Sequence, residues 1–542
     1  MNHINILRIP DYVTVFSETE SFTLHSRYSE KTWFAGDIKV HTVPGKNELC
    51  ILLSAPDTAI TRMHLRWQAK IQPGLRFLGD DWERSYGTFE WRGLVPERVM
   101  PWYFLIHDGK RTDGYGVKTG ARSLCCWQMD SAGLSLWLDV RSGGVGIQLR
   151  DRQLEVATVV TRQGDSEESA FQAVRAFCKQ MCDRPLMPAS PVYGGNNWYY
   201  AYGNSSHEQI LEDAKLIADL APSSSNRPFM VIDDGWQIRH EPEAGFNGGP
   251  WNTGNEKFPD MAGLAESIKE MGVRPGIWFR PLLTKANVPH PWLLPAHRMD
   301  NYEPGPVLDP SIPEVLDHVT TDVKRLTDWG YELIKHDFTT VDISGRLGRD
   351  MGRQFTFDGW SFADRSKTTA EIILDLYHTI REAAGNILII GCNTVGHLAA
   401  GLVELQRIGD DTSGRQWERT RFMGINSLAF RAAQHGTFFA VDADCVGLTN
   451  QVPWEMNQQW LDLLTRSGTP LFVSASPDAV GPEQKTALKQ AFALASKEQP
   501  LCEPLDWLDT TCPCQWQLGV QTIHYDWFGN QGIVLSQDQR ML

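Results

Sequence analysis

The sequence lacks the features that mark most metal enzymes, membrane proteins and nucleic-acid-binding proteins. Its 15 His residues form neither an HxH nor an HExxH pattern, which excludes the common histidine-based metal motifs. Lys and Arg number 51 against 66 Asp and Glu, so the net charge of −15 provides no basic surface for nucleic acid or an anionic membrane. No apolar run reaches the roughly 18 residues that a membrane-spanning helix needs. We therefore expect no metal, no cofactor, and neither nucleic acid nor membrane as a partner.

Disulfide and targeting signals are also missing. The ten Cys residues form no CxxC…CxxC array, although Cys125 adjoins Cys126 and Cys512 lies two residues before Cys514, so we expect buried thiols. Residues 1–15 lack a basic start followed by an apolar core, so we expect no secretory signal and a cytoplasmic location. The sequence leaves open whether the chain forms a homo-oligomer.

The hydrophobic pattern changes along the chain in a way that indicates several domains. The 542 residues suffice for about three domains of roughly 150 residues each. Short segments rich in Thr, Val, Ile and aromatic residues, separated by turn residues, predict an antiparallel β-sandwich over residues 1–165. Helical spacing over Glu167–Cys182, followed by three Pro residues, predicts a linker helix over 166–190.

Residues 191–480 alternate short apolar strands with helices, which predicts a (β/α)8 barrel of the TIM type. The eight predicted strands are Val192–Tyr199, Phe229–Asp234, Pro275–Arg280, Tyr331–Asp337, Asn386–Asn393, Leu405–Asp411, Thr437–Asp442 and Pro470–Ser474. The predicted helices between them include Ser206–Leu220, Ala262–Met271, Ile312–Trp329, Thr368–Ala384 and Gln416–Gln434. The connection from Asn393 to Leu405 is too short for a full helix, so one unit should be degenerate.

After a predicted helix near Pro482–Ser496, β spacing returns in Trp516–Trp527 and Gly532–Gln537. This pattern predicts a helix and a small C-terminal β domain over residues 481–542. The expected fold class is therefore multidomain, α/β plus β, with an N-terminal antiparallel β-sandwich, a central (β/α)8 barrel and a small C-terminal β-sheet.

Aspartates stand at the ends of four predicted barrel strands. They are Asp233 and Asp234 after the second strand, Asp337 after the fourth, Asp410 and Asp411 after the sixth, and Asp442 and Asp444 after the seventh. Because the carboxyl ends of barrel strands converge on one face, these carboxylates should meet there. Any one of them could simply cap a helix. Several together, without a His cluster, favour glycosidic bond cleavage by paired carboxyl groups.

Tryptophan is abundant, with 20 residues. An indole ring offers a large flat surface for the apolar face of a sugar. Trp198, Trp236 and Trp278 lie at or near predicted strand ends, so we expect them to contact a pyranose. Most other Trp residues, such as Trp329 at a helix end, we expect in the core.

Several motifs of the predicted barrel resemble those of the α-galactosidases of glycoside hydrolase family 36, of which family 27 is a clan relative. The resemblance rests on motifs in the family's order: Val231–Trp236 (VIDDGW), Lys335-His336-Asp337, Gly391-Cys392, Arg407-Ile408-Gly409 followed by Asp411-Thr412, and Asp442–Cys445 (DADC). As a set these motifs are specific, and they span the barrel. The order of sandwich, barrel and small sheet is also similar.

The resemblance implies a role for each matching residue. Asp337 would be the nucleophile, ionised beside Lys335, and Asp411 the acid/base, held protonated until it donates to the leaving oxygen. The neighbouring Asp410 would be structural. The implied sugar-binding residues are Asp233 and Asp234 for the 4- and 6-hydroxyls, Lys335 for another hydroxyl, Arg407 and Cys392 near the 2-hydroxyl, and Trp198, Trp236, Trp278 and Asn393.

Two positions depart from the family pattern. The first strand reads Gly195–Tyr199 (GNNWY) where relatives carry Gly-Trp-Asn, so its contribution is shifted. Arg280 ends the third strand, where it could pair with an aspartate or meet an acidic substituent. We favour the internal pair.

The resemblance implies a retaining exo-glycosidase that releases terminal α-galactosyl residues from oligosaccharides. The same machinery could accept α-N-acetylgalactosamine or β-L-arabinopyranose, or transfer the sugar to an acceptor other than water. Cys392 argues against an N-acetyl group, which needs more room near carbon 2. Outside enzymes, the chain could be a catalytically silent sugar-binding barrel. A lyase or aldolase would need a metal or a Schiff-base lysine such as Lys335, but its neighbour Asp337 and the motif set argue against this.

The motif analysis predicts that cleavage of an aryl α-galactoside needs no metal ion, because two carboxyl groups suffice for the chemistry. Dialysis against a strong chelator should leave the rate unchanged relative to a sample dialysed against plain buffer. A loss of activity that zinc, manganese or calcium restores would contradict this prediction.

Overall fold

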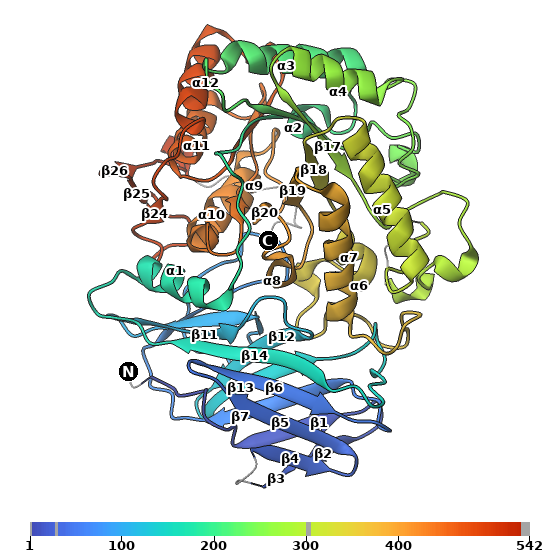
Figure 1. The fold of residues 1–542 in the computed structure, drawn as a ribbon. Helices are drawn as coiled ribbons and strands as arrows, with labels where there is room; N and C mark the ends of the chain where they lie inside the picture. Colours follow the sequence, from blue (N-terminus) through green and yellow to red (C-terminus); the bar gives the residue numbers. More distant parts are fainter. Residues whose placement is uncertain (1–2, 28–30, 300–304, 533–542) are drawn as a thin grey trace.

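The computed structural model describes residues 3–27, 31–299 and 305–532. Two antiparallel sheets form the lower part of the molecule in Figure 1, and a parallel sheet surrounded by helices forms the upper part. A three-stranded sheet stands at the side of the upper part. The predicted fold class of sandwich, barrel and small sheet is confirmed.

The sandwich strands alternate buried and exposed side chains because one face of each sheet covers the core. One sheet contains, in spatial order, β2 (Ser21–Thr23), β1 (Tyr12–Phe16), β7 (Arg62–Gln68), β13 (Gly133–Asp139), β12 (Leu124–Asp130) and β9 (Met100–Pro101). The other contains β3 (His25–Arg27), β4 (Thr32–Ala35), β5 (Ile38–Pro44), β6 (Glu48–Ser54), β14 (Leu154–Arg162), β11 (Thr112–Val117), β10 (Tyr103–His107) and β8 (Arg76–Gly79).

All eight predicted barrel strands are present. They are β15 (Tyr193–Asn196), β16 (Phe229–Ile232), β17 (Arg274–Phe279), β18 (Leu333–His336), β19 (Leu388–Gly391), β20 (Leu405–Arg407), β21 (Ala440–Asp442) and β23 (Leu471–Ala475). The seventh strand continues as β22 (Cys445–Leu448) after a bend at Asp444, whose φ of 74° lies in the left-handed region. Because β21 pairs with β20 while β22 pairs with β23, this bent strand closes the barrel.

The helices follow the predicted pattern, with capping side chains at several N-termini, such as Ser206 and Thr368. They are α1 (Ala170–Met181), α2 (Trp198–Ala201), α3 (His207–Leu220), α4 (Met261–Glu270), α5 (Pro313–Asp328), α6 (Thr339–Ser344), α7 (Thr369–Ala384), α8 (Gly396–Ala399), α9 (Trp417–Thr420), α10 (Ser427–Arg431), α11 (Trp454–Arg466) and α12 (Pro482–Ala495). Short 3-10 turns are η2 (Pro242–Ala244), η3 (His290–Trp292), η4 (Ala296–Arg298), η5 (Gly348–Asp350), η7 (Ala432–Gln434), η8 (Pro477–Ala479) and η9 (Gly529–Gln531).

Two helical regions of the barrel are irregular. The helix predicted over Gln416–Gln434 is broken into α9, a π-helical segment η6 (Arg421–Asn426), α10 and η7. The four-residue helix α8 is the degenerate unit expected between Asn393 and Leu405. None of the described helices is both long and apolar enough to cross a bilayer.

The C-terminal sheet consists of β24 (Glu503–Pro504), β25 (Gln515–Leu518) and β26 (Gln521–His524). Its hairpin of β25 and β26 spans Gln515–His524, which begins one residue before the predicted β region Trp516–Trp527 and ends inside it. Of the second predicted segment, Gly532–Gln537, residues 533–537 lie outside the described part of the chain. All ten Cys residues are free thiols; eight are buried and two half-buried.

A loop of the sandwich crosses the rim of the barrel directly after β8. Ser85 forms a parallel bridge with Gly409, in which its N–H donates to the Ile408 carbonyl at 2.8 Å and its carbonyl accepts from Asp410 N at 2.7 Å. Trp82, three residues earlier, donates its indole N–H to the Gly352 carbonyl at 3.0 Å. The sandwich therefore extends the end of β20, where Asp410 and Asp411 stand.

The junction requires a glycine at position 409 because the backbone of η6 lies directly against it. A methyl group at Gly409 would lie 2.0 Å from the Met423 carbonyl oxygen in η6. We expect Gly409→Ala to destabilise the protein by about 1–3 kcal/mol, since either β20 or η6 must shift. The measurement is the denaturant midpoint compared with Gly93→Ala, where the added methyl group would meet nothing within 4 Å. Equal midpoints for the two variants would contradict this packing argument.

Candidate active site

Asp337 directly follows β18, and two N–H groups hold its carboxylate. The Phe338 backbone N–H donates to Oδ1 at 2.7 Å, and the Trp278 indole N–H donates to Oδ2 at 3.2 Å. Phe338 starts α6 with a φ of 62°, an uncommon backbone conformation for a residue with a side chain. The turn after β18 therefore fixes the orientation of a carboxylate that is only 7% exposed.

Lys335, on the same strand, contacts the aspartate at the end of the second strand. Its ammonium donates to Asp233 Oδ2 at 2.7 Å, and the Asn196 side-chain amide donates to the same oxygen at 2.7 Å. Burial favours the neutral amine, but Asp233 outweighs it and raises the pKa of Lys335 above its usual value. A lysine held as the ammonium cannot form a Schiff base, which argues against the lyase alternative.

Asp234 is surrounded by side-chain donors. Gln237 Nε2 donates to Oδ1 at 2.7 Å, and Asn247 Nδ2 donates to Oδ2 at 3.0 Å. His240 Nδ1 lies 3.3 Å from Oδ1. These contacts fix the second carboxylate of the Asp233–Asp234 pair, so that both point in set directions after β16.

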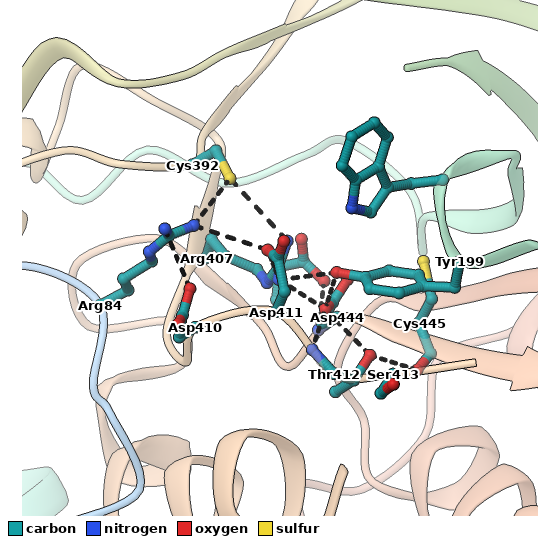
Figure 2. A network of polar contacts seen from close by, with 12 residues as sticks. Arg84, Tyr199, Cys392, Arg407, Asp410, Asp411, Thr412, Ser413, Asp444 and Cys445 are labelled. Atoms are coloured by element: carbon teal, nitrogen blue, oxygen red, sulfur yellow. Dashed lines mark hydrogen bonds and ion pairs between the residues drawn. The ribbon is translucent and has the colours of Figure 1, made fainter. Parts of the chain in front are cut away.

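Arg407 lies at the centre of a network that joins three strands (Figure 2). Its guanidinium donates to Asp411 Oδ1 at 2.9 Å and to the Tyr199 hydroxyl at 3.0 Å, and it also contacts Asp444. Asp444 further accepts from Tyr199 and from both the backbone and hydroxyl of Thr412. The side chain of Arg407 is only 1% exposed, so these partners compensate a buried charge.

A second arginine reaches this network from the sandwich. Arg84, on the loop after β8, lies 2.9 Å from Asp410 Oδ1 and 3.6 Å from Asp411 Oδ1 (Figure 2). Arg419 contacts the other oxygen of Asp410 at 2.8 Å. The sequence analysis missed Arg84. Its only signal was the four charged residues among residues 80–84, which interrupt the β pattern of the sandwich.

The environment of Asp411 differs from the expectation of a carboxyl group held protonated. Burial favours the neutral acid, but Arg407 and then Arg84 outweigh it and hold the pKa of Asp411 below its usual range. The expectation of a protonated Asp411 did not include these cations, because the motif carries no information on an arginine from the sandwich. The Asp411 side chain is 34% exposed and that of Asp410 13%, so Asp411 is the more accessible of the two.

Cys392 and Asn393 follow β19, and Cys392 contacts both arginines of this network (Figure 2). Cys392 Sγ is 3.8 Å from one nitrogen of Arg84 and 3.8 Å from one of Arg407, and burial raises the pKa of its thiol. Asn393 accepts from Val341 N at 3.2 Å, and its amide N–H₂ donates to Glu83. Both ends of the Asn393 side chain are thus occupied by protein, which conflicts with the expected role in sugar binding.

The three candidate Trp residues differ in position. Trp236 is fully buried and donates its indole N–H to the Trp278 carbonyl at 2.8 Å, so it supports Trp278 and presents no face to a ligand. Trp278 is 1% exposed, with its N–H on Asp337. Trp198 is half-buried, at the start of α2. Trp329 lies against Trp236 and is half-buried.

Arg280 pairs internally, as the sequence analysis favoured. It is 0% exposed and its Nε donates to Asp342 Oδ2 at 2.9 Å. A further nitrogen donates to Asn247 Oδ1 at 2.6 Å, which links Arg280 to the donor that holds Asp234. Arg280 therefore orients Asn247, which in turn donates to Asp234.

The arrangement offers two carboxylates in different surroundings on one face of the barrel. Asp337 accepts hydrogen bonds from uncharged N–H groups, whereas Asp411 is bound by guanidinium groups. Such a pair can supply a nucleophile and a proton-transferring group. Within the described residues, no three His, Cys, Asp or Glu side chains are grouped as metal ligands would be.

No family model matches this chain. Among curated proteins, alpha-galactosidase AgaA of Geobacillus stearothermophilus is 28% identical over 213 residues, covering 37% of this chain and 27% of the relative. The match thus spans about a quarter of that relative's length. The solved structure of AgaA, a GH36 alpha-galactosidase, has a TM-score of 0.58 at 16% identity, covering 88% of this chain and 69% of that chain.

Two further solved structures cover nearly the whole chain. TtGalA, an alpha-galactosidase from Thermus thermophilus solved with p-nitrophenyl alpha-D-galactopyranoside, has a TM-score of 0.59 at 18% identity, covering 95% of this chain and 99% of that chain. A GH31 family sulfoquinovosidase from E. rectale also reaches 0.59, at 12% identity, covering 96% and 87%. The chain resembles GH36 alpha-galactosidases, but likeness in fold does not by itself choose the sugar.

The geometry of the second-strand pair predicts that Asp233→Asn and Asp234→Asn each lower kcat/KM on an aryl α-galactoside. A loss of about 10- to 100-fold is expected, since in the role that the resemblance implies each change would remove one charge-assisted hydrogen bond to the sugar. The matched control is Asp219→Asn on the exposed side of α3, which should leave the rate unchanged. Equal cleavage of α-glucoside and α-galactoside by the unmodified protein would contradict the assignment.

Proposed function

We propose that this protein is a retaining exo-glycosidase that hydrolyses terminal α-galactosyl residues of oligosaccharides. The observation that carries the proposal is the pair Asp337 and Asp411, which follow the fourth and sixth parallel strands of one barrel. Further support comes from the Asp233–Lys335 ion pair beside them. The resemblance to alpha-galactosidases agrees with this chemistry.

In the first step, Asp337 attacks the anomeric carbon and forms a covalent glycosyl-enzyme. Its hydrogen bonds from Trp278 and Phe338 hold the carboxylate in one orientation, which lowers the entropic cost of the attack. Asp411 gives its proton to the leaving oxygen in the same step. In the second step, Asp411 acts as the base and takes a proton from the water that releases the sugar.

The arginines beside Asp411 favour the second step over the first. Arg407 and Arg84 favour its carboxylate form, which is the form that the second step needs. The first step needs the acid, so a poor leaving group should depend more strongly on pH than an activated one. A good leaving group departs without a proton and avoids this dependence.

The family resemblance implies that Cys392 lies near carbon 2 of the sugar, which favours a hydroxyl there. The thiol is fully buried with Arg84 and Arg407 nearby. An N-acetyl group would need more room at this point, so α-N-acetylgalactosamine is the weaker alternative. β-L-Arabinopyranosides, transfer to another acceptor, a cytoplasmic location and assembly as a homo-oligomer stay predictions from the sequence alone.

The two carboxyl groups should fail differently when replaced. In Asp337→Gly no covalent intermediate can form, so added azide should attack an activated α-galactoside directly and give β-galactosyl azide. In Asp411→Ala the intermediate still forms from a good leaving group but lacks its base, so azide should give the α-galactosyl azide. Nuclear magnetic resonance of the isolated azides reads the configuration in each case.

Asp410→Ala is the matched control for this experiment, because Asp410 is the adjacent aspartate and contacts the same arginine. It should keep its activity on activated substrates without azide. If Asp410→Ala shows azide rescue while Asp411→Ala stays active, the acid/base has been assigned to the wrong one of the two neighbours.

A further inference from the structure

We propose that Arg84 of the β-sandwich is a positioning residue for the acid/base Asp411, so that the sandwich is part of the catalytic apparatus. This inference rests on the proposed function of Asp411. It goes beyond that function because it assigns a role to a residue outside the barrel. None of the motifs that carry the family resemblance includes Arg84.

The loop that carries Arg84 is fixed to the barrel on both sides of it. Glu83 accepts from Gly348 N at 2.6 Å and also contacts the side chain of Asn393. Ser85 pairs with the backbone around Gly409. Consecutive residues of one sandwich loop thus contact the loops after three different barrel strands, which leaves the backbone of Arg84 little freedom.

The guanidinium of Arg84 is placed between three functional groups. It lies 2.9 Å from Asp410, 3.6 Å from Asp411 and 3.8 Å from Cys392 Sγ, while its side chain is only 9% exposed. Asp410 is also held by Arg419 from the helix side. Asp410 therefore holds one nitrogen of the Arg84 guanidinium, and a second nitrogen of the same group lies near Asp411.

The charged and titratable groups around Asp411 come from every neighbouring element. They are Arg407 on β20, Arg84 on the sandwich loop, Lys335 on β18, Arg419 on α9, Tyr199 on α2, Asp410 beside it and Asp444 in the bend of the seventh strand. Each of these cations also has another carboxylate partner: Arg407 contacts Asp444, Lys335 contacts Asp233, and both Arg84 and Arg419 contact Asp410. Arg407 contributes most to the lowered pKa of Asp411, and Arg84 follows it.

A change at Arg84 should alter the pH dependence of the proton-requiring step. The charge of Arg84 favours the ionised carboxyl group, so its removal should raise the pKa of Asp411 and keep the acid protonated to higher pH. A general loss of structure would instead reduce the rate at every pH and leave the position of the alkaline limb unchanged.

The main experiment compares Arg84→Met with the unmodified protein on an unactivated galactosyl oligosaccharide. The alkaline limb of the profile of kcat/KM against pH should move upward by about one pH unit, the lower end of the effect of an adjacent opposite charge. On an aryl galactoside with a good leaving group the limb should not move, because that substrate needs no proton. A limb that stays in place on the oligosaccharide would overturn the inference.

Two control variants separate charge from structure. Arg84→Lys keeps the charge and should leave the limb close to that of the unmodified protein. Arg98→Met removes a half-buried arginine of the same sandwich that donates to the Phe77 and Glu90 carbonyls. It should not move the limb, and an equal shift in Arg98→Met would attribute the effect to the sandwich as a whole and overturn the role of Arg84.

A second readout needs no turnover. Carboxyl groups are labelled with a carbodiimide and a small amine over a pH series, and peptide mass spectrometry gives the labelling midpoint of Asp411 relative to the exposed Asp509. In Arg84→Met this midpoint should move to higher pH, whereas a change in accessibility alone would raise labelling at all pH values. An unchanged midpoint would overturn the inference even if the unmodified protein cleaved no glycoside, a result that would separately overturn the proposed function.

Discussion

The site depends on the contacts that the buried guanidinium of Arg407 makes with its three partners. An arginine without partners inside a barrel would be costly, so Asp444, Tyr199 and Asp411 must all be in place around it. The same contacts hold the bend of the seventh strand, through which the barrel closes. The closure of the barrel and the position of Asp411 thus depend on the same contacts.

The two carboxyl groups, Asp337 and Asp411, differ in the charge of the groups that donate to them. Asp337 receives its hydrogen bonds from uncharged N–H groups, while Asp411 faces Arg407 and Arg84. Two chemically identical side chains can therefore act as nucleophile and proton carrier. Because Arg84 belongs to the sandwich, the docking of the two regions determines the charge that surrounds Asp411.

The sequence predicts the barrel and its carboxylates well because both follow from local patterns. Aspartates at strand ends meet at one face whatever the loops do. Arg84 was missed because it reaches the site from a sandwich loop, through contacts that no local pattern records. Trp236 was placed near a sugar because its position after β16 does not tell which way its ring points, and the ring lies in the core. The protonation of Asp411 could not be predicted without Arg84.

The central claim is that Asp337 forms a covalent bond to the sugar. It is tested most directly by incubating the protein with a fluorinated α-galactosyl fluoride whose glycosyl-enzyme breaks down slowly, then mapping the labelled peptide by mass spectrometry. One added fluorogalactosyl group is expected on Asp337, and none in Asp337→Gly. A label on Asp411 or another carboxyl group, or steady turnover with no labelled peptide at all, would contradict it.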